Sequence, residues 1–223
     1  MTSRLRRMLL INTKTGGTQS SAAINELNPQ DGAAVTGDNG VGKTTTLEII
    51  PLFFGTSPSQ ITETAGGREP MLRFLLPHAD SAIVFEYQRG SDPTRDVRCV
   101  VLRRQASSDA PEFRFIPCGF NQDFFTRTTE QGLLCNNDEE MVEAIIALGV
   151  RPSPKLAISD YKHVILGTNS QSQLAAKLRL MAHEYSLAPR ALPHLDRLIA
   201  SVVKQEVNFH DFVRVAVNIV QDK

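Results

Sequence analysis

The first half of the chain contains short apolar runs bounded by turn-forming residues, a pattern that predicts β-strands. Residues 8–13 predict a first strand and residues 22–27 a second, which ends at a turn over residues 28–32. Residues 33–36 form a further short apolar run that leads directly into a glycine-rich loop. We therefore expect a short buried strand immediately before this loop.

A helix is expected after the glycine-rich loop, over residues 44–54, until Gly55 and Pro58 end it. The apolar positions expected on one side of this helix are Leu47, Ile50 and Phe54. Pro51 should kink the helix or end it early, because proline lacks an amide hydrogen and clashes with the preceding turn. Residues 56–70 are rich in Ser, Thr, Gly and Pro without periodicity, and predict a long surface loop.

Three further apolar runs predict an antiparallel meander. They cover residues 81–87, 97–103 and 112–117, and are separated by turn-forming residues. Charged and apolar residues alternate in residues 97–103, which predicts a sheet with one face in water.

The remainder of the chain is predicted to be mostly helical. Helical spacing of apolar residues is found in residues 138–148, 171–185, 192–204 and 208–221. In the first of these helices the apolar positions are Met141, Val142, Ile145, Ile146 and Leu148. The last pattern runs to the end of the sequence without a cap, so we expect the chain to be cut from something longer.

Composition narrows the function without identifying it. The 223 residues are 41% apolar and 22% charged with a net charge of zero, which is typical of a globular domain. A neutral chain does not bind nucleic acid through bulk positive charge, so any such contact requires a local patch. The three cysteines form no C-x-x-C pair, which argues against disulfides and structural zinc and favours the cytoplasm. No segment approaches the roughly 18 apolar residues of a membrane span.

The glycine-rich loop satisfies G-x-x-x-x-G-K-[ST] in full, between a predicted buried strand and a predicted helix. The residues expected to bind nucleotide are Gly37, Asp38, Asn39, Gly40, Val41, Gly42, Lys43, Thr44 and Thr45. Glycines let the backbone curl so that amide groups point at phosphate oxygens, and the start of a helix adds partial positive charge. The motif therefore predicts a site for ATP and Mg²⁺.

Individual roles follow from the motif. Lys43 should reach the β- and γ-phosphates and is the candidate catalytic residue. The Thr44 hydroxyl should bind Mg²⁺, and Thr45 is a weaker candidate for a further phosphate contact.

The form G-x-N-G-x-G-K-[ST]-[ST] over residues 37–45 resembles ABC-type ATPases, and in particular the SMC and MukB-like heads. A first strand that ends at Asn12 and the Phe53-Phe54-Gly55 run after the loop are similar to the opening of an SMC N-terminal lobe. The resemblance is specific over about residues 5–55. Within the family it favours the bacterial MukB-like branch, which includes condensins and the SMC-like subunit of Wadjet-type plasmid defence.

The resemblance implies an α/β P-loop fold that forms half of an ATPase head. Residues 1–223 would be the N-terminal head lobe, with a mixed sheet around the P-loop strand. Its parts would be a P-loop core at 1–55, a loop with an antiparallel β-subdomain at 56–117, and a helical part at 118–223 that leads to a coiled coil.

The motifs that complete such a head are not found in this sequence. There is no signature serine loop and no strand that ends in Asp-Glu; the nearest candidate is Glu86, which we expect to face solvent. The resemblance therefore implies that ATP hydrolysis requires the C-terminal lobe of the same polypeptide and a second head in a homodimer. It also implies DNA and a kleisin-type subunit as partners, no membrane, and a cytoplasmic, nucleoid-associated location serving chromosome organisation, repair or plasmid defence.

Two further sets of residues are suggested by the resemblance. Gln60 is a candidate for the glutamine that contacts magnesium in these heads. The basic residues expected on one edge of the first strands, as candidate DNA phosphate contacts, are Arg4, Arg6, Arg7 and Lys14.

Two alternatives belong to other classes. A self-contained P-loop kinase or GTPase would need its own acidic strand end, and a parallel βα repeat is expected where this chain predicts a meander. A non-catalytic scaffold would bind nucleotide without turnover, even with its partner lobe.

Overall fold

The computed structural model describes residues 4–15, 18–19, 24–28, 43–61, 70–90, 92, 94–130, 132–167, 176–188, 190–192, 195–196 and 198–199. The predicted strand at 33–36 and the predicted helix at 208–221 lie outside these residues, as does most of the predicted helix at 192–204. Among the helices that are described, none has both the length and the apolar character needed to cross a bilayer.

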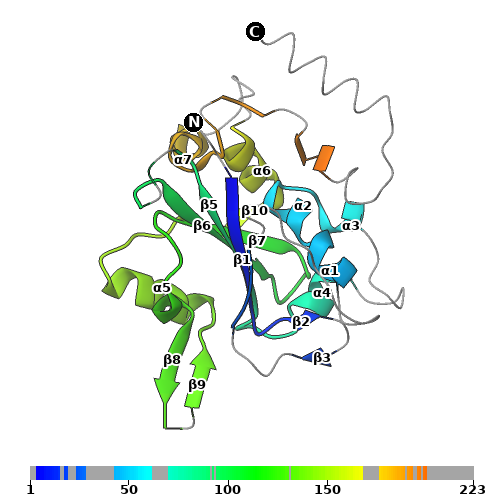
Figure 1. Cartoon of the computed structure of the whole chain (residues 1–223), viewed down its shortest axis with the longest axis vertical. Helices are drawn as coiled ribbons and strands as arrows, with labels where there is room; N and C mark the ends of the chain where they lie inside the picture. The colour runs from blue at the N-terminus through cyan, green and yellow to red at the C-terminus, as the bar shows by residue number, and fades with distance from the viewer. Residues whose placement is uncertain are drawn as a thin grey trace.

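A six-stranded sheet is the centre of the fold, and every pair of neighbouring strands in it is antiparallel (Figure 1). Its spatial order is β10 (Leu156–Ala157), β7 (Pro111–Ile116), β6 (Val97–Arg104), β5 (Ala82–Gln88), β1 (Arg4–Ile11) and β4 (Ile24–Leu27). The predicted meander is confirmed, since β5 pairs with β6 and β6 with β7. The first strand is also confirmed, although β1 begins four residues before the predicted start.

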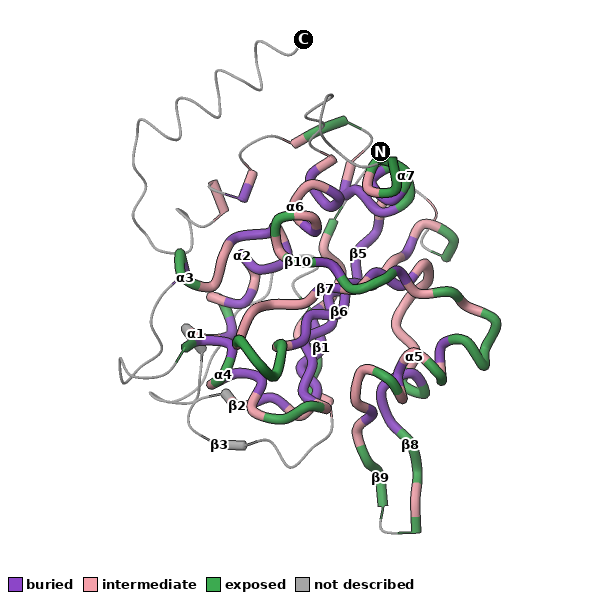
Figure 2. Tube along the Cα trace, turned by 180° about the vertical axis from the view of Figure 1, so that it is seen from behind, coloured by how far each residue is buried: buried purple, intermediate pink, exposed green. Residues whose placement is uncertain are grey.

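Helices and two small hairpins surround this sheet. The helices are α1 (Lys43–Glu48), α2 (Ile50–Phe53), α3 (Pro58–Ile61), α4 (Met71–Leu75), α5 (Asp138–Ala147), α6 (Ile158–Leu166) and α7 (Ala176–Tyr185), with a 3-10 turn η1 (Gln122–Phe124). The hairpins are β2 (Lys14–Thr15) with β3 (Thr18–Gln19), and β8 (Thr126–Thr129) with β9 (Gly132–Cys135). The second hairpin projects from the body beside α5 (Figures 1 and 2).

Both faces of the sheet are covered, so the prediction of one wet face is wrong. On one face, Met8, Ile83 and Phe85 pack with residues from α2, α4, α6 and α7. On the other face, Leu9 and Val84 pack with residues from η1 and α5. All seven residues of β5 are buried as a result, as Figure 2 shows. Strands covered on both faces lose the alternation that marks a half-exposed sheet.

Several elements were not predicted. The loop expected at 56–70 contains α3, whose Ile61 is buried, and α4 follows it. The part expected to be helical, 118–223, contains the β8–β9 hairpin and β10 as well as α6, which periodicity did not indicate. Short elements such as these produce too few periods for a sequence pattern to be distinctive.

Helix α5 confirms the helix predicted at 138–148 and shows why it starts where it does. Asn137 caps it: the Asn137 side chain accepts from the backbone N–H of Glu140, and the Glu140 carboxylate accepts from the Asn137 N–H. Its predicted apolar face is only partly buried, since Ile146 and Leu148 are each 56% exposed. Met141 and Ile145 of this face are buried and pack in the core against the sheet.

Asp138, the first residue of α5, joins that helix to the outer strands. Its carboxylate accepts from Arg114 Nη2 at 2.9 Å and lies 3.3 Å from Lys155 Nζ. The Asp138 side chain is 20% exposed, so these cations are only partly screened by water. Burial alone would raise the pKa of Asp138, but the hydrogen bonds and charges of Arg114 and Lys155 outweigh it and hold the pKa below its ordinary value.

The free energy of unfolding should therefore depend on the Asp138 charge. Because the folded-state pKa of Asp138 is depressed, its ion pairs stabilise the fold at neutral pH. This stabilisation is lost as the pH falls below about 4, through the folded-state pKa. We expect Asp138→Asn to lower the free energy of unfolding by about 2 kcal/mol at pH 7, and by less at pH 3. Urea denaturation at both pH values tests this, with exposed Glu139→Gln from the same helical turn as the control. An Asp138→Asn effect that does not vary with pH would contradict the ion-pair explanation.

Candidate functional site

Only the last two residues of the phosphate-binding motif, Lys43 and Thr44, belong to the described part of the chain. Residues 37–42 lie outside the described part of the chain, and α1 begins at Lys43, followed by Thr44. The backbone is therefore helical where the motif places the start of a helix. Of the next two residues, Thr45 is half-buried and Thr46 is 9% exposed.

The helix breaks before Pro51, as predicted. Residue Ile49 forms a turn between α1 and α2, and its carbonyl accepts from the N–H of Leu52 at 3.0 Å. The break rotates the apolar side, so the predicted face is wrong: Leu47 is 45% exposed while Ile49 is fully buried. The chain then leaves α2 through Gly55, whose φ of 79° is in the left-handed region that favours glycine.

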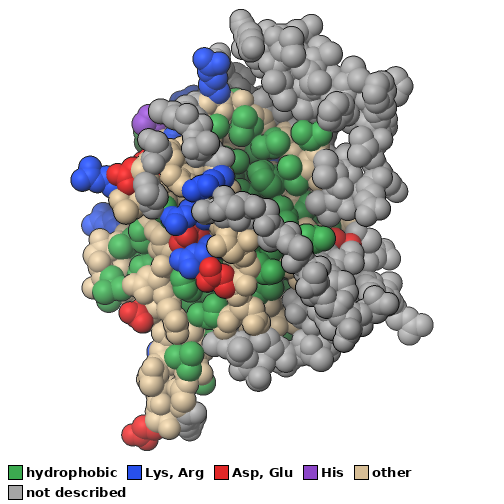
Figure 3. All heavy atoms as spheres, viewed as in Figure 1, with side chains coloured by type: hydrophobic (Ala, Val, Ile, Leu, Met, Phe, Trp, Pro, Cys, Tyr) green, Lys and Arg blue, Asp and Glu red, His purple; other side chains and the backbone are tan. Residues whose placement is uncertain are grey.

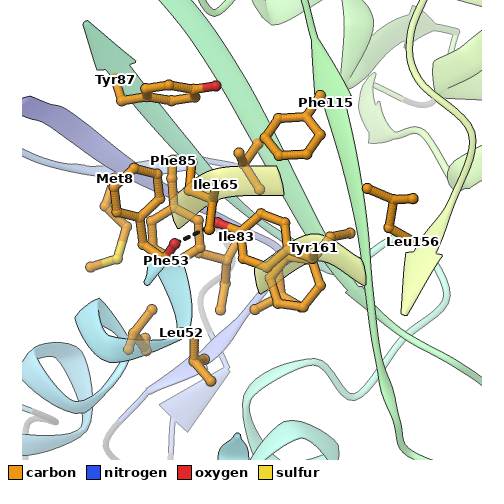
Figure 4. Packing of buried hydrophobic residues seen from close by; sticks show 14 of the residues in the cluster. Met8, Leu52, Phe53, Ile83, Phe85, Tyr87, Phe115, Leu156, Tyr161 and Ile165 are labelled. Carbon is orange, nitrogen blue, oxygen red and sulfur yellow. Dashed lines mark hydrogen bonds between the residues drawn. The ribbon is translucent and has the colours of Figure 1, made fainter. Parts of the chain in front are cut away.

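Aromatic packing holds α2 against the sheet. The Phe53 ring is fully buried, and its centroid lies 5.4 Å from that of Phe85 and 5.5 Å from that of Tyr87, both on β5. Helix α6 adds a polar contact, because the Tyr161 hydroxyl donates to the Phe53 carbonyl at 2.5 Å (Figure 4). Burial raises the pKa of Tyr161 well above its ordinary value, so this hydroxyl keeps its proton. The segment that follows the phosphate-binding motif is thus fixed from two sides.

Gln60 lies in α3 with an exposed side chain. Its Oε1 accepts from the backbone N–H of Ser57 at 3.3 Å, within the same short helical turn. The role of Gln60 in binding Mg²⁺ stays a prediction.

The four basic residues predicted as DNA contacts do not form one group. Arg4 is exposed at the start of β1, whereas Lys14 lies beyond the other end of that strand, with its Nζ 5.1 Å from the centre of the Phe74 ring. Arg6 and Arg7 converge on Glu86 instead. Figure 3 shows basic and acidic side chains interleaved over β1 on this face of the described part of the chain. DNA binding by these residues stays a prediction.

Glu86 is buried, so the expectation that it faces solvent is wrong. Its side chain is 4% exposed, and its two oxygens accept from Arg7 Nε at 3.0 Å and Arg7 Nη2 at 3.1 Å. The backbone N–H of Phe120 donates to the same carboxylate at 2.7 Å. The hydrogen bonds to Glu86 raise the pKa of Arg7, against the opposing effect of burial. Glu86 is therefore held as one half of an ion pair.

The physical reason is strand pairing. Arg7 and Glu86 are directly opposite each other on β1 and β5, and cross-strand partners share one face of a sheet. Arg7 stands directly before the apolar run of β1, and Glu86 stands inside that of β5. Their opposite charges are the signal that could have identified this pair in the sequence.

Other candidate chemistry is limited in the described residues. They contain no group of three or more His, Cys, Asp and Glu side chains suited to a metal ion. The three cysteines are unbridged, and burial raises the pKa of the Cys99 thiol well above its ordinary value, which keeps it protonated. A surface pocket of about 580 Å³ lies between α7 and residues 149–154, and none of its lining residues belongs to α1 or α2.

Comparison with known proteins adds a family. No curated protein and no solved structure matches the chain. Residues 10–223, which include the whole phosphate-binding motif and all elements from β4 to α7, match one family. The chain therefore belongs to the family described as "Protein of unknown function (DUF3584)".

Proposed function

We propose that this chain binds ATP with Mg²⁺ and forms the N-terminal lobe of an SMC or MukB-like ATPase head. The observation that carries the proposal is the complete motif from Gly37 to Thr44, whose last two residues belong to helix α1. Amide groups of the curled loop, the lysine ammonium and the threonine hydroxyl are the groups that bind a triphosphate and its metal ion.

The packing behind α1 supports this proposal. A loop that binds phosphates with its backbone amides must keep them oriented, and this requires a rigid helix after it. Ile49, Leu52 and Phe53 are each fully buried immediately after α1. The segment that would support the loop is therefore anchored in the core.

The proposed chemistry needs partners. Hydrolysis would require a carboxylate to activate water, and the strand carboxylate nearest to such a role in the sequence, Glu86, is held by Arg7 and Phe120. This favours half of a head over a self-contained kinase or GTPase. The C-terminal lobe and a second head would supply the missing groups, and the assembly would act on DNA through ATP-dependent head engagement. We expect the isolated chain to bind ATP weakly and to hydrolyse it negligibly.

Substituting the motif tests the proposal directly. We expect Lys43→Ala to weaken binding of a fluorescent ATP analogue at least tenfold, which corresponds to about 1.4 kcal/mol, because the variant lacks the ammonium that neutralises the phosphates. Gly42→Ala should have a similar effect by blocking the backbone conformation. Lys177→Ala, which removes an exposed lysine on α7, is the control for loss of charge. Micromolar affinity in both motif variants would refute the proposed function.

A further inference from the structure

Helix α6 connects the segment after the phosphate-binding motif to the last described residues of the chain. On one side, Tyr161 donates to the Phe53 carbonyl of α2. On the other side, the carbonyl of Leu166 accepts from the N–H of Leu192 at 2.8 Å. Leu192 and Leu195 are partly buried against the same core as Phe53. One helix is therefore in contact with both regions.

The contact between α6 and the end of α2 is close. A Cβ atom added to Gly55 would lie 2.8 Å from the Cβ of Lys162, which is shorter than real Cβ contacts. The backbone of Gly55 also has a positive φ. The close approach and the positive φ both favour glycine at position 55, so the backbone that leaves α2 lies directly against Lys162.

Asp196 completes a latch at this point, which we define as Thr56, Lys162 and Asp196. The Asp196 side chain is 5% exposed, and its Oδ2 lies 2.5 Å from Lys162 Nζ. The Thr56 hydroxyl donates to the Asp196 backbone carbonyl at 3.1 Å. Thr56, which follows Gly55, and Lys162, which contacts Gly55, thus both bind Asp196.

The latch joins distant parts of the sequence through a buried ion pair and a hydrogen bond. Thr56 and Asp196 are 140 residues apart. A buried carboxylate that loses its cation is strongly destabilised, so Asp196 favours the position in which Lys162 is within reach. The docking of Leu195 and Asp196 and the placement of α2 are consequently linked.

We propose that the latch couples the docking of Leu195 and Asp196 to the position of α2 and, through α2, to nucleotide binding at the phosphate-binding motif. Lys162 and Asp196 are positioning residues that act through Gly55 and Thr56. This inference rests on the proposed function. Coupling is reciprocal: a nucleotide that favours the packed position of α2 strengthens the docking of Leu195 and Asp196, and loss of the latch weakens nucleotide binding.

Hydrogen exchange and nucleotide titration on the same variants test the coupling. In the unsubstituted chain, a non-hydrolysable ATP analogue with Mg²⁺ should slow amide exchange in residues 195–199. Lys162→Met and Asp196→Asn should abolish this slowing and weaken analogue binding about fivefold or more. Lys162→Arg, which retains a cation for Asp196, should restore both properties.

The control is a lysine in a comparable ion pair elsewhere. Lys155 is 46% exposed and pairs with Glu112 and Asp138, whereas Lys162 is 37% exposed. Lys155→Met should leave analogue affinity and the exchange of residues 195–199 unchanged. Far-ultraviolet circular dichroism of each variant confirms that it is folded, and Lys162→Arg provides a result if Lys162→Met does not fold.

The outcomes separate the inference from the proposed function. If the unsubstituted chain binds the analogue and exchange in residues 195–199 does not change, the coupling is overturned and the proposed function stands. If Lys162→Met binds as tightly as the unsubstituted chain, the coupling is likewise overturned. If the unsubstituted chain does not bind the analogue at all, the proposed function fails, and the coupling fails with it.

Discussion

Glu86→Gln is expected to lower the free energy of unfolding by about 2–4 kcal/mol, although the two side chains have nearly the same shape. The Glu86 carboxylate accepts hydrogen bonds with both oxygens, from Arg7 on one side and from the Phe120 N–H on the other. Glutamine presents one oxygen and one NH₂ group. In either orientation of the amide, an N–H donor faces Arg7 or Phe120, and a buried hydrogen bond is lost.

Chemical denaturation at pH 7 measures this effect, and the chain offers a matched control. Glu26 also binds Arg7, at 3.2 Å from Nη1, but its side chain is 45% exposed. Glu26→Gln should therefore change the free energy of unfolding by less than about 1 kcal/mol. Both variants remove a carboxylate from the same arginine, so the comparison measures what burial and the additional hydrogen bond from Phe120 contribute. Equal effects of the two substitutions would mean that the Arg7–Glu86 pair is not buried in solution.

Strands β1, β5, β6 and β7 could be predicted from the sequence because their signals are local. The runs that became β5, β6 and β7 are apolar, short and separated by Gly, Pro, Asp and Ser. The break at Ile49 followed from the chemistry of Pro51 alone. A signal that is complete within a dozen residues does not depend on the rest of the fold.

Burial could not be predicted in the same way, because it depends on elements far away in the sequence. Arg103 on β6 was part of the charged and apolar alternation, yet its side chain is 7% exposed. It donates to the carbonyls of Ala79, Ser81 and Asn136, and burial lowers its pKa to about 10. Those acceptors come from the residues before β5 and before α5. The residues next to Arg103 in the sequence do not indicate these acceptors.

The same contrast between local and long-range signals applies to the candidate site. The glycine-rich motif over residues 37–44 is contiguous, so the nucleotide site that we propose there can be predicted without a structure. The latch of Thr56, Lys162 and Asp196 depends on α6, which supplies Lys162 and which periodicity did not indicate. Positioning groups of this kind become visible only when the packing of the supporting helix is known.

Phe53→Ala is expected to lower the free energy of unfolding by about 3–5 kcal/mol, the largest effect we predict. The ring is fully buried between α2 and the sheet, where it contacts the rings of Phe54, Phe85 and Tyr87. Removing it leaves a cavity that these neighbours fill only in part, because packed aromatic rings have few alternative rotamers. Thermal and urea denaturation measure the loss.

Leu47→Ala is the matched control, because Leu47 lies one helix earlier and is 45% exposed. It should change the free energy of unfolding by less than about 0.5 kcal/mol. The sequence alone places Leu47 on the apolar side of this segment, so the two substitutions discriminate between the uninterrupted helix and the helix broken at Ile49. If Leu47→Ala were as destabilising as Phe53→Ala, the break, and with it the orientation of α1 behind the phosphate-binding motif, would be wrong.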